Sequence, residues 1–176
     1  MRNKMVIAGL AIMGAFVLGC GAGTDDSAGG SVSGNSNAGG DDQKAAKIGE
    51  PARDGKFEFT VSKIKCGVAK VGSDFLEEKA QGQYCLVTVN VKNIGKEAQY
   101  FSDSDQKAYS SDGTEYSTDS AAGLVANKDA DTIFNQINPG NQVTGILVYD
   151  IPKDVTLTKL ELHDSAFSDG VTVELG

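Results

Sequence analysis

The apolar side chains in the longer, C-terminal part of the chain recur mostly at every second position, which is the period of a β-strand. In residues 57–61, two phenylalanines and a valine alternate with polar residues. Ile64 and Cys66 continue this alternation one position out of phase. That offset predicts a single strand with a β-bulge near Ser62 and Lys63.

A second run, residues 85–91, alternates as regularly, with a cysteine followed by three valines on one phase. Cys66 and Cys85 both fall on the apolar phase of their strands, so both are predicted to point into the core. The residues between the two strands, 67–84, are largely hydrophilic and are predicted to form an excursion from the fold.

Later segments add turns and strands. Asp112 and Gly113 separate two short alternating runs and predict a hairpin, and residues 138–140 (Asn-Pro-Gly) predict another sharp turn. Residues 142–149 (QVTGILVY) are apolar on both phases, as expected of a central strand that is covered on both faces. Further strands are predicted at residues 157–162 and 171–175, and a short helix is allowed within residues 120–131.

About seven to eight short strands with frequent turns and little helical pattern predict an all-β fold. We therefore expect residues 51–176 to form one antiparallel β-sandwich domain, which is long enough to bury a real core.

The first twenty residues have the order of a bacterial lipoprotein signal. Basic Arg2 and Lys4 precede the uncharged residues 5–18, and small residues lead to Cys20. Residues 1–19 are predicted to be a signal peptide, and Cys20 is predicted to become the lipidated N-terminus. A membrane-spanning anchor fits less well, because glycines and Asp25 follow where a spanning helix would need apolar length and then positive charge. A freely secreted form remains the other alternative.

Residues 20–50 are predicted to be a flexible linker behind the lipidated cysteine. This stretch consists mainly of Gly, Ser, Ala, Asn and Asp and has almost no apolar side chain that could support a core. A chain of this type spans about 30 Å, which is enough to hold a domain away from lipid headgroups.

The three cysteines are accounted for once Cys20 carries the lipid. Cys66 and Cys85 then form an even pair in an exported domain, where disulfides persist, and we predict that they are bonded. Two buried thiols or a metal pair are the alternatives. Because one histidine and this cysteine spacing match no zinc motif, no metal site is predicted.

The charge balance limits the partners. The whole chain has a formal net charge of −8, and removal of the signal peptide makes it about −10. Such a chain repels nucleic acid and has no basic patch for anionic lipid, so its predicted hold on the membrane is the acyl anchor.

No catalytic constellation stands out, and neither a cofactor nor an enzymatic activity is predicted. The only histidine, His163, precedes Asp164 and Ser165, but three neighbouring residues cannot adopt the geometry of a catalytic triad. His163 is instead interpreted as a strand-end residue. The aspartates at 103, 105 and 112 lack the glycine and the final glutamate of a calcium loop, so calcium binding is left as an open alternative and not a prediction.

Four segments resemble the telokin-like domain of unknown function 4352, a family of exported proteins and lipoproteins of Gram-positive bacteria. They are GKFEFTVSKIKC, YCLVTVNVKNIGKEAQYF, INPGNQVTGILVYDIP and KLELHDSAFSDGVTVEL, and they cover nearly all of the chain from Asp54 onward. The resemblance implies an immunoglobulin-like sandwich and carries over no catalytic or ligand-binding residue. Unlike antibody domains, this chain has no Trp, and its cysteine pair lies on adjacent segments.

Two functional hypotheses remain. The first is a non-enzymatic interaction module, anchored on the extracytoplasmic side of the cell membrane, that binds an envelope or extracellular protein or polymer. The second is a carrier or sensor of a small ligand or ion. A flat apolar patch of several hundred Å² favours the first, and a buried pocket with convergent polar groups favours the second.

Overall fold

The computed structural model describes residues 44–73, 75–127 and 133–176. The predicted signal peptide, Cys20 and most of the predicted linker lie outside the described residues. Within residues 44–54 the first strands are β1 (Ala46–Lys47) and β2 (Pro51–Asp54). The fold therefore begins before the boundary expected at residue 51, because β1 pairs in parallel with the last strand.

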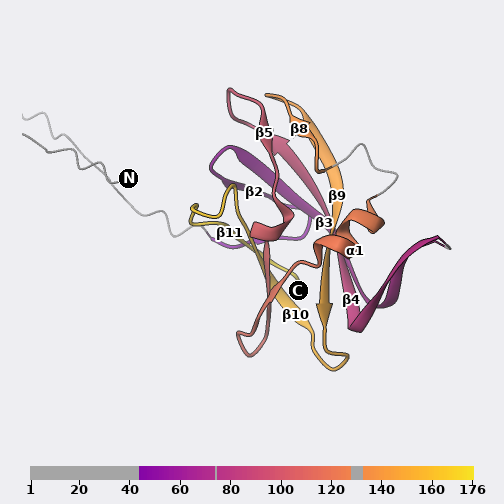
Figure 1. The fold of residues 1–176 in the computed structure, drawn as a ribbon. Helices are drawn as coiled ribbons and strands as arrows, with labels where there is room; N and C mark the ends of the chain where they lie inside the picture. The colour runs from indigo at the N-terminus through magenta and orange to yellow at the C-terminus, as the bar shows by residue number, and fades with distance from the viewer. Residues whose placement is uncertain (1–43, 74, 128–132) are drawn as a thin grey trace, which may run out of the picture. The chain divides into compact units, whose positions relative to one another are not determined.

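The domain is a sandwich of two sheets with a small third sheet (Figure 1). One sheet has the order β1, β11 (Val171–Glu174), β10 (Leu157–Leu162), β6 (Lys107–Ser110) and β7 (Glu115–Ser117). The other has the order β2, β3 (Phe57–Ser73), β4 (Leu76–Asn93) and β9 (Gln142–Ile151). β5 (Gln99–Tyr100) pairs with β8 (Gln136–Ile137).

The predicted all-β sandwich is confirmed, and it contains more strands than the seven or eight expected. The described residues form eleven strands, because β1, β5 and β8 have only two residues each and leave no alternation in the sequence. The two predicted turns are present: Ser110 accepts a backbone hydrogen bond from Gly113, and Asn138 accepts one from Asn141. The predicted short helix is α1 (Ser120–Ala126).

The main core lies between the two large sheets. Phe57, Phe59 and Phe101 are buried there with ring centroids 5.9–6.1 Å apart, a spacing typical of favourable aromatic pairs. Its other fully buried members include Val61, Val87, Val89, Val91, Leu160, Leu162 and Val173. The alternation in residues 57–61 and 85–91 thus predicts the inward face correctly.

One prediction about an individual strand is wrong. β9 is an edge strand of its sheet and not a central one; it is apolar on both phases because Leu147 faces the main core while Val148 packs beneath α1. Residues 67–84 form an excursion between the two strands, as predicted, and most of them continue β3 and β4 as a long hairpin.

The predicted bulge is present, as the β3–β4 register shifts between Val61 and Lys63. A second shift follows Lys65. This second irregularity turns β3 again, so Cys66 is exposed while Cys85 is fully buried. The prediction that both cysteines point inward is correct only for Cys85.

Candidate functional site

One end of the sandwich is formed by four loops, residues 54–56, 93–98, 138–141 and 163–170, which we call the loop end. Asn93, fully buried at the end of β4, joins two of these loops. Its side-chain amide donates to the carbonyls of Glu97 (2.7 Å) and Ile137 (2.8 Å), and its backbone carbonyl accepts from the amide of Gly140 (2.8 Å). This one residue therefore ties both loops to the end of β4.

The other two loops are tied in by backbone amides. Asp54 Oδ2 accepts a hydrogen bond of 2.6 Å from the amide of Asp164, and the amide of Ile94 donates to the carbonyl of Lys56 at 2.8 Å. These bonds link loop 54–56 to both loop 163–170 and loop 93–98. The loop end is thus preorganised, which lowers the entropy cost of binding to it.

Large apolar side chains stand exposed on and beside the loop end. Phe167 is 98% exposed and Ile94 is 40% exposed, and Tyr100 in β5 is 67% exposed. Single exposed apolar residues are common on protein surfaces, but aromatic side chains on a fixed set of loops are typical of binding surfaces.

His163 lies where β10 leads into the loop end. Buried Gln106 holds its backbone on both sides, accepting from the His163 amide (2.8 Å) and donating to its carbonyl (3.1 Å). The ring nitrogens lie 3.0 Å from Glu161 Oε1 and 3.1 Å from the carbonyl oxygen of Ser168. His163 is therefore the strand-end residue that was predicted, and its partly buried ring braces loop 163–170.

A shallow cavity of about 280 Å³ opens beside this ring on the outer face of the five-stranded sheet. Tyr109 donates to Glu115 across it at 3.1 Å; burial, followed by this hydrogen bond, raises the pKa of Tyr109 to about 12. The cavity is lined by Ser104, Asp105, Lys107, Tyr109, Glu115, Glu161, His163 and Ala166.

The interpretation that His163, Asp164 and Ser165 form no triad agrees with their placement. Asp164 lies against Gly55 and not against the ring, and Ser165 hydrogen-bonds with Ser168. The hydroxyl of Ser165 accepts from the amide of Phe167 at 3.4 Å. The serine hydroxyl beside the ring is that of Ser168, 3.5 Å from His163 Nδ1, and it donates to the carbonyl of Ser165 at 2.9 Å, so it is not positioned as an activated nucleophile.

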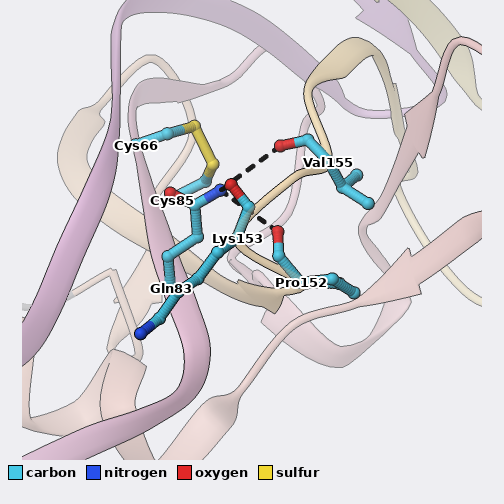
Figure 2. Close-up of a disulfide and its surroundings, with 6 residues drawn as sticks. All are labelled: Cys66, Gln83, Cys85, Pro152, Lys153 and Val155. Atoms are coloured by element: carbon cyan, nitrogen blue, oxygen red, sulfur yellow. Dashed lines mark hydrogen bonds between the residues drawn. A yellow bond between two sulfur atoms is a disulfide. The ribbon is translucent and has the colours of Figure 1, made fainter.

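A second candidate region is the β3–β4 hairpin beyond the disulfide, residues 67–73 and 75–84, which we call the arm. In Figure 1 it extends past the sandwich on the side where α1 lies. The predicted bond between Cys66 and Cys85 is present and closes the base of the arm (Figure 2).

Gln83 fastens the base of the arm to the turn between β9 and β10. Its side-chain amide lies within hydrogen-bond distance of three backbone carbonyls, those of Pro152 (3.1 Å), Lys153 (3.1 Å) and Val155 (3.3 Å), as Figure 2 shows. The disulfide and Gln83 together set the direction in which the arm leaves the sheet.

The arm packs against α1 through a second apolar cluster, which we call the α1 cluster. Its buried members are Val71, Tyr84, Ala122 and Val148. Gly72 (φ +95°) permits the close approach, because a Cβ there would collide with the carbonyl of Leu76 and a methyl group of Val125.

Polar caps complete the α1 cluster. Asp119 caps α1 by accepting from the amide of Ala122 (2.9 Å), and its second oxygen accepts from the Tyr84 hydroxyl (3.3 Å). Burial, followed by the charge of Asp119, raises the pKa of Tyr84 to about 12. Asn127, at the end of α1, bonds both the amide and the carbonyl of Ile146 at 2.8 Å.

The turn of the arm presents two large apolar side chains to solvent. Phe75 is 99% exposed and Leu76 is 66% exposed. Next to them, Glu77 lies 2.6 Å from Lys70 and 3.1 Å from Lys79, and hydrogen bonds from these two lysines, Lys70 first, lower its pKa.

The aspartates considered for calcium are not brought together. Asp103 and Asp105 lie in a short 3-10 helix, whereas the carboxylate of Asp112 accepts from Ser110 (2.6 Å) and from the amide of Thr114 (3.1 Å) within its own turn. Across the described ranges there is no group of three or more His, Cys, Asp and Glu side chains that could hold a metal ion.

Sequence reasoning missed Asn93, Asn127, Gln83 and the exposed Phe75. The three amides act through bonds to carbonyls far along the chain, which leave no local pattern. Phe75 carried a usable signal, because a phenylalanine followed by a leucine inside an otherwise hydrophilic stretch is unusual.

Residues 46–172 match the domain of unknown function DUF4352. The chain belongs to this family. A curated relative is the uncharacterized protein YxkC of Bacillus subtilis, 29% identical over 119 residues, which are 64% of this chain and 66% of the relative, slightly less than two thirds of its length.

Solved structures of the same fold are distant in sequence. The secreted protein MPT63 of Mycobacterium tuberculosis has a TM-score of 0.56 at 18% identity, covering 74% of this chain and 96% of its own. The yjhA protein of Bacillus subtilis has a TM-score of 0.55 at 18% identity, covering 74% and 99%. The protein ycdA of the same species, described as a candidate lipoprotein, has a TM-score of 0.50 at 16% identity, covering 70% and 38%.

These relatives are β-sandwich proteins that are uncharacterized or secreted, and the family indicates no enzymatic activity. In the part of the chain that the structure describes, no helix has the length and apolar character needed to cross a membrane.

Proposed function

We propose that this protein is an extracytoplasmic lipoprotein, anchored through Cys20, that displays its sandwich as a non-enzymatic interaction module for an envelope or extracellular protein or polymer. The observation that carries the proposal is the loop end: four loops locked together by Asn93 and Asp54, beside which Phe167 and Tyr100 are exposed. A rigid set of loops with exposed aromatic side chains suits binding to a macromolecule.

The anchor is supported by the lipoprotein signal around Cys20. It is also supported by two proteins of similar structure, the secreted MPT63 and the candidate lipoprotein ycdA. Fatty-acid labelling of cells that express the Cys20→Ala variant or the wild type tests it. The variant is expected to remain unprocessed and to incorporate no labelled fatty acid, whereas the wild type is labelled. Equal labelling of both proteins would show that Cys20 is not the site of lipid attachment.

The interaction surface is tested by crosslinking intact cells that display the wild-type protein. A partner that crosslinks to the wild type is expected to be lost with the double variant Tyr100→Ala/Phe167→Ala and retained with Phe75→Ala, which removes an equally exposed ring from the arm. Loss with Phe75→Ala alone would assign binding to the arm instead.

A carrier or sensor of a small ligand is the second candidate, and the cavity beside His163 favours it because Tyr109, Glu161 and His163 converge there. Its three acids, Asp105, Glu115 and Glu161, suit a cationic ligand. An amine or cation that raises the Tm of the wild type but not of Glu161→Gln, together with no crosslinked partner, would replace the interaction module by this function.

A further inference from the structure

The turn of the arm places an aromatic ring and an aliphatic side chain where no other described side chain covers them. Ser73 and Leu76 face each other across the hairpin, and Phe75, in the turn between them, is 99% exposed. A projecting ring of this kind forms no concave site for a small ligand. It suits insertion into a soft apolar phase.

The charges nearest this pair are largely balanced. Glu77 is paired with both Lys70 and Lys79, at 2.6 and 3.1 Å, so the two lysines do not form a free basic patch. Glu78 is exposed and acidic, and Asp74 lies outside the described residues. Any attraction of the arm to a membrane is therefore apolar and gains nothing from anionic headgroups.

The arm is also held in place before it meets a partner. The disulfide and Gln83 fix its base, and the α1 cluster supports it along its length. A fixed arm loses little conformational entropy when its turn is immobilised, so a small apolar contact can suffice.

The chain outside the described residues determines what the arm meets first. Between Cys20 and Lys44 lie 23 residues. A flexible chain of this length has an end-to-end distance of about 25–30 Å. A domain on a tether of that length encounters the bilayer at high effective concentration, so that even a weak contact with lipid is populated.

We infer that Phe75 and Leu76 insert into the interfacial region of the lipid bilayer to which the chain is tethered, which orients the sandwich on the membrane; this inference rests on the proposed anchor at Cys20. The arm is the membrane-contacting element of the domain.

Single-tryptophan variants test this directly, because the natural chain contains no Trp. Phe75→Trp reports on the arm, and Phe167→Trp is the matched control, since the two phenylalanines are 99% and 98% exposed. Chains that begin at Cys20, with Cys66 and Cys85 bonded, are coupled through the Cys20 thiol to a maleimide phospholipid in phosphatidylcholine vesicles. This coupling supplies the tether whether or not cells lipidate Cys20, so failure of the anchor and failure of the inference give different results.

The expected result for the Phe75→Trp variant is a shift of its indole emission to shorter wavelength and several-fold stronger quenching by brominated lipid than for the Phe167→Trp variant. Phosphatidylglycerol in the vesicles is expected to add no quenching. Equal spectra and equal quenching of the two variants would overturn the inference, and so would quenching of the arm variant that requires phosphatidylglycerol. Emission of the arm variant that responds to the crosslinked partner and not to vesicles would also overturn it, and would assign the arm to a protein contact.

Discussion

The two faces of the β2–β3–β4–β9 sheet are covered in different ways. One face meets the other large sheet through an extensive core with Phe57, Phe59 and Phe101 at its centre. The opposite face is covered locally by α1, with four buried residues, a carboxylate cap and a nearby disulfide. The difference indicates that the sandwich and the arm are stabilised by separate means, so the arm can be altered while the sandwich stays folded.

Truncation of one apolar residue on each face gives the largest effect. Phe59→Ala is expected to lower the free energy of unfolding by about 3–5 kcal/mol, because it leaves a cavity in the main core. Val71→Ala in the α1 cluster is expected to cost about 1–2 kcal/mol. Urea unfolding followed by circular dichroism measures both.

Hydrogen exchange shows whether the second effect is local. With Val71→Ala, amides of the arm and of α1 are expected to exchange faster while those of β10 and β11 keep their protection. Uniform acceleration throughout the domain would mean that the two faces form one cooperative unit.

Removal of the disulfide comes next in size. The double variant Cys66→Ala/Cys85→Ala is expected to lose about 3 kcal/mol of stability, since the bond closes a short loop in the unfolded chain. Cys20→Ala, which leaves the bond intact, is the control. An unchanged urea midpoint for the double variant would show that the hydrogen bonds of Gln83 and the α1 cluster hold the arm without the disulfide.

The smallest effects, of opposite sign, are expected at two tyrosines on the two faces. Tyr84→Phe removes the hydrogen bond to Asp119 and is expected to cost about 1 kcal/mol. Tyr149 faces the main core, and its fully buried hydroxyl has no hydrogen-bond partner among the described residues. Tyr149→Phe is therefore expected to be neutral or stabilising by about 1 kcal/mol.

The pH dependence of stability gives a further test of the role of Tyr84. A phenol with a raised pKa favours its neutral form in the folded state, so its contribution is fully present below the unfolded pKa of about 10 and is lost as the pH rises toward the folded value. For Tyr84 that value is about 12. Between pH 10 and 12, the Tyr84→Phe variant is expected to lose less stability than the wild type. An identical loss in both proteins would show that ionisation of Tyr84 does not contribute to the loss of stability.

The same difference between the faces explains what the sequence could predict. The main core is visible in the alternation of residues 57–61 and 85–91, because each step of a regular strand reverses the side chain. The exposure of Cys66 could not be predicted from the sequence, because a second bulge after Lys65 turns the strand again.

The element that covers the outer face of β9 could not be predicted either. A run such as residues 142–149 is apolar on both phases whether its second cover is a sheet or a single short helix. Of the candidate site, the disulfide followed from counting cysteines. The loop end did not, because Asn93 and Asp54 act on residues far away in the chain.

Asn127 has a consequence for molecules that crowd together on one surface. Its side chain accepts a hydrogen bond from the amide of Ile146 and donates one to the carbonyl of Ile146, on the outer edge of β9. Beside it, the amide of Asp119 donates to the carbonyl of Val148. An open strand edge is a template for the next molecule and a route to fibrous aggregates. With these groups already bonded, neighbouring copies cannot extend the sheet along this part of β9, and many copies can stand side by side in a dense layer without polymerising there.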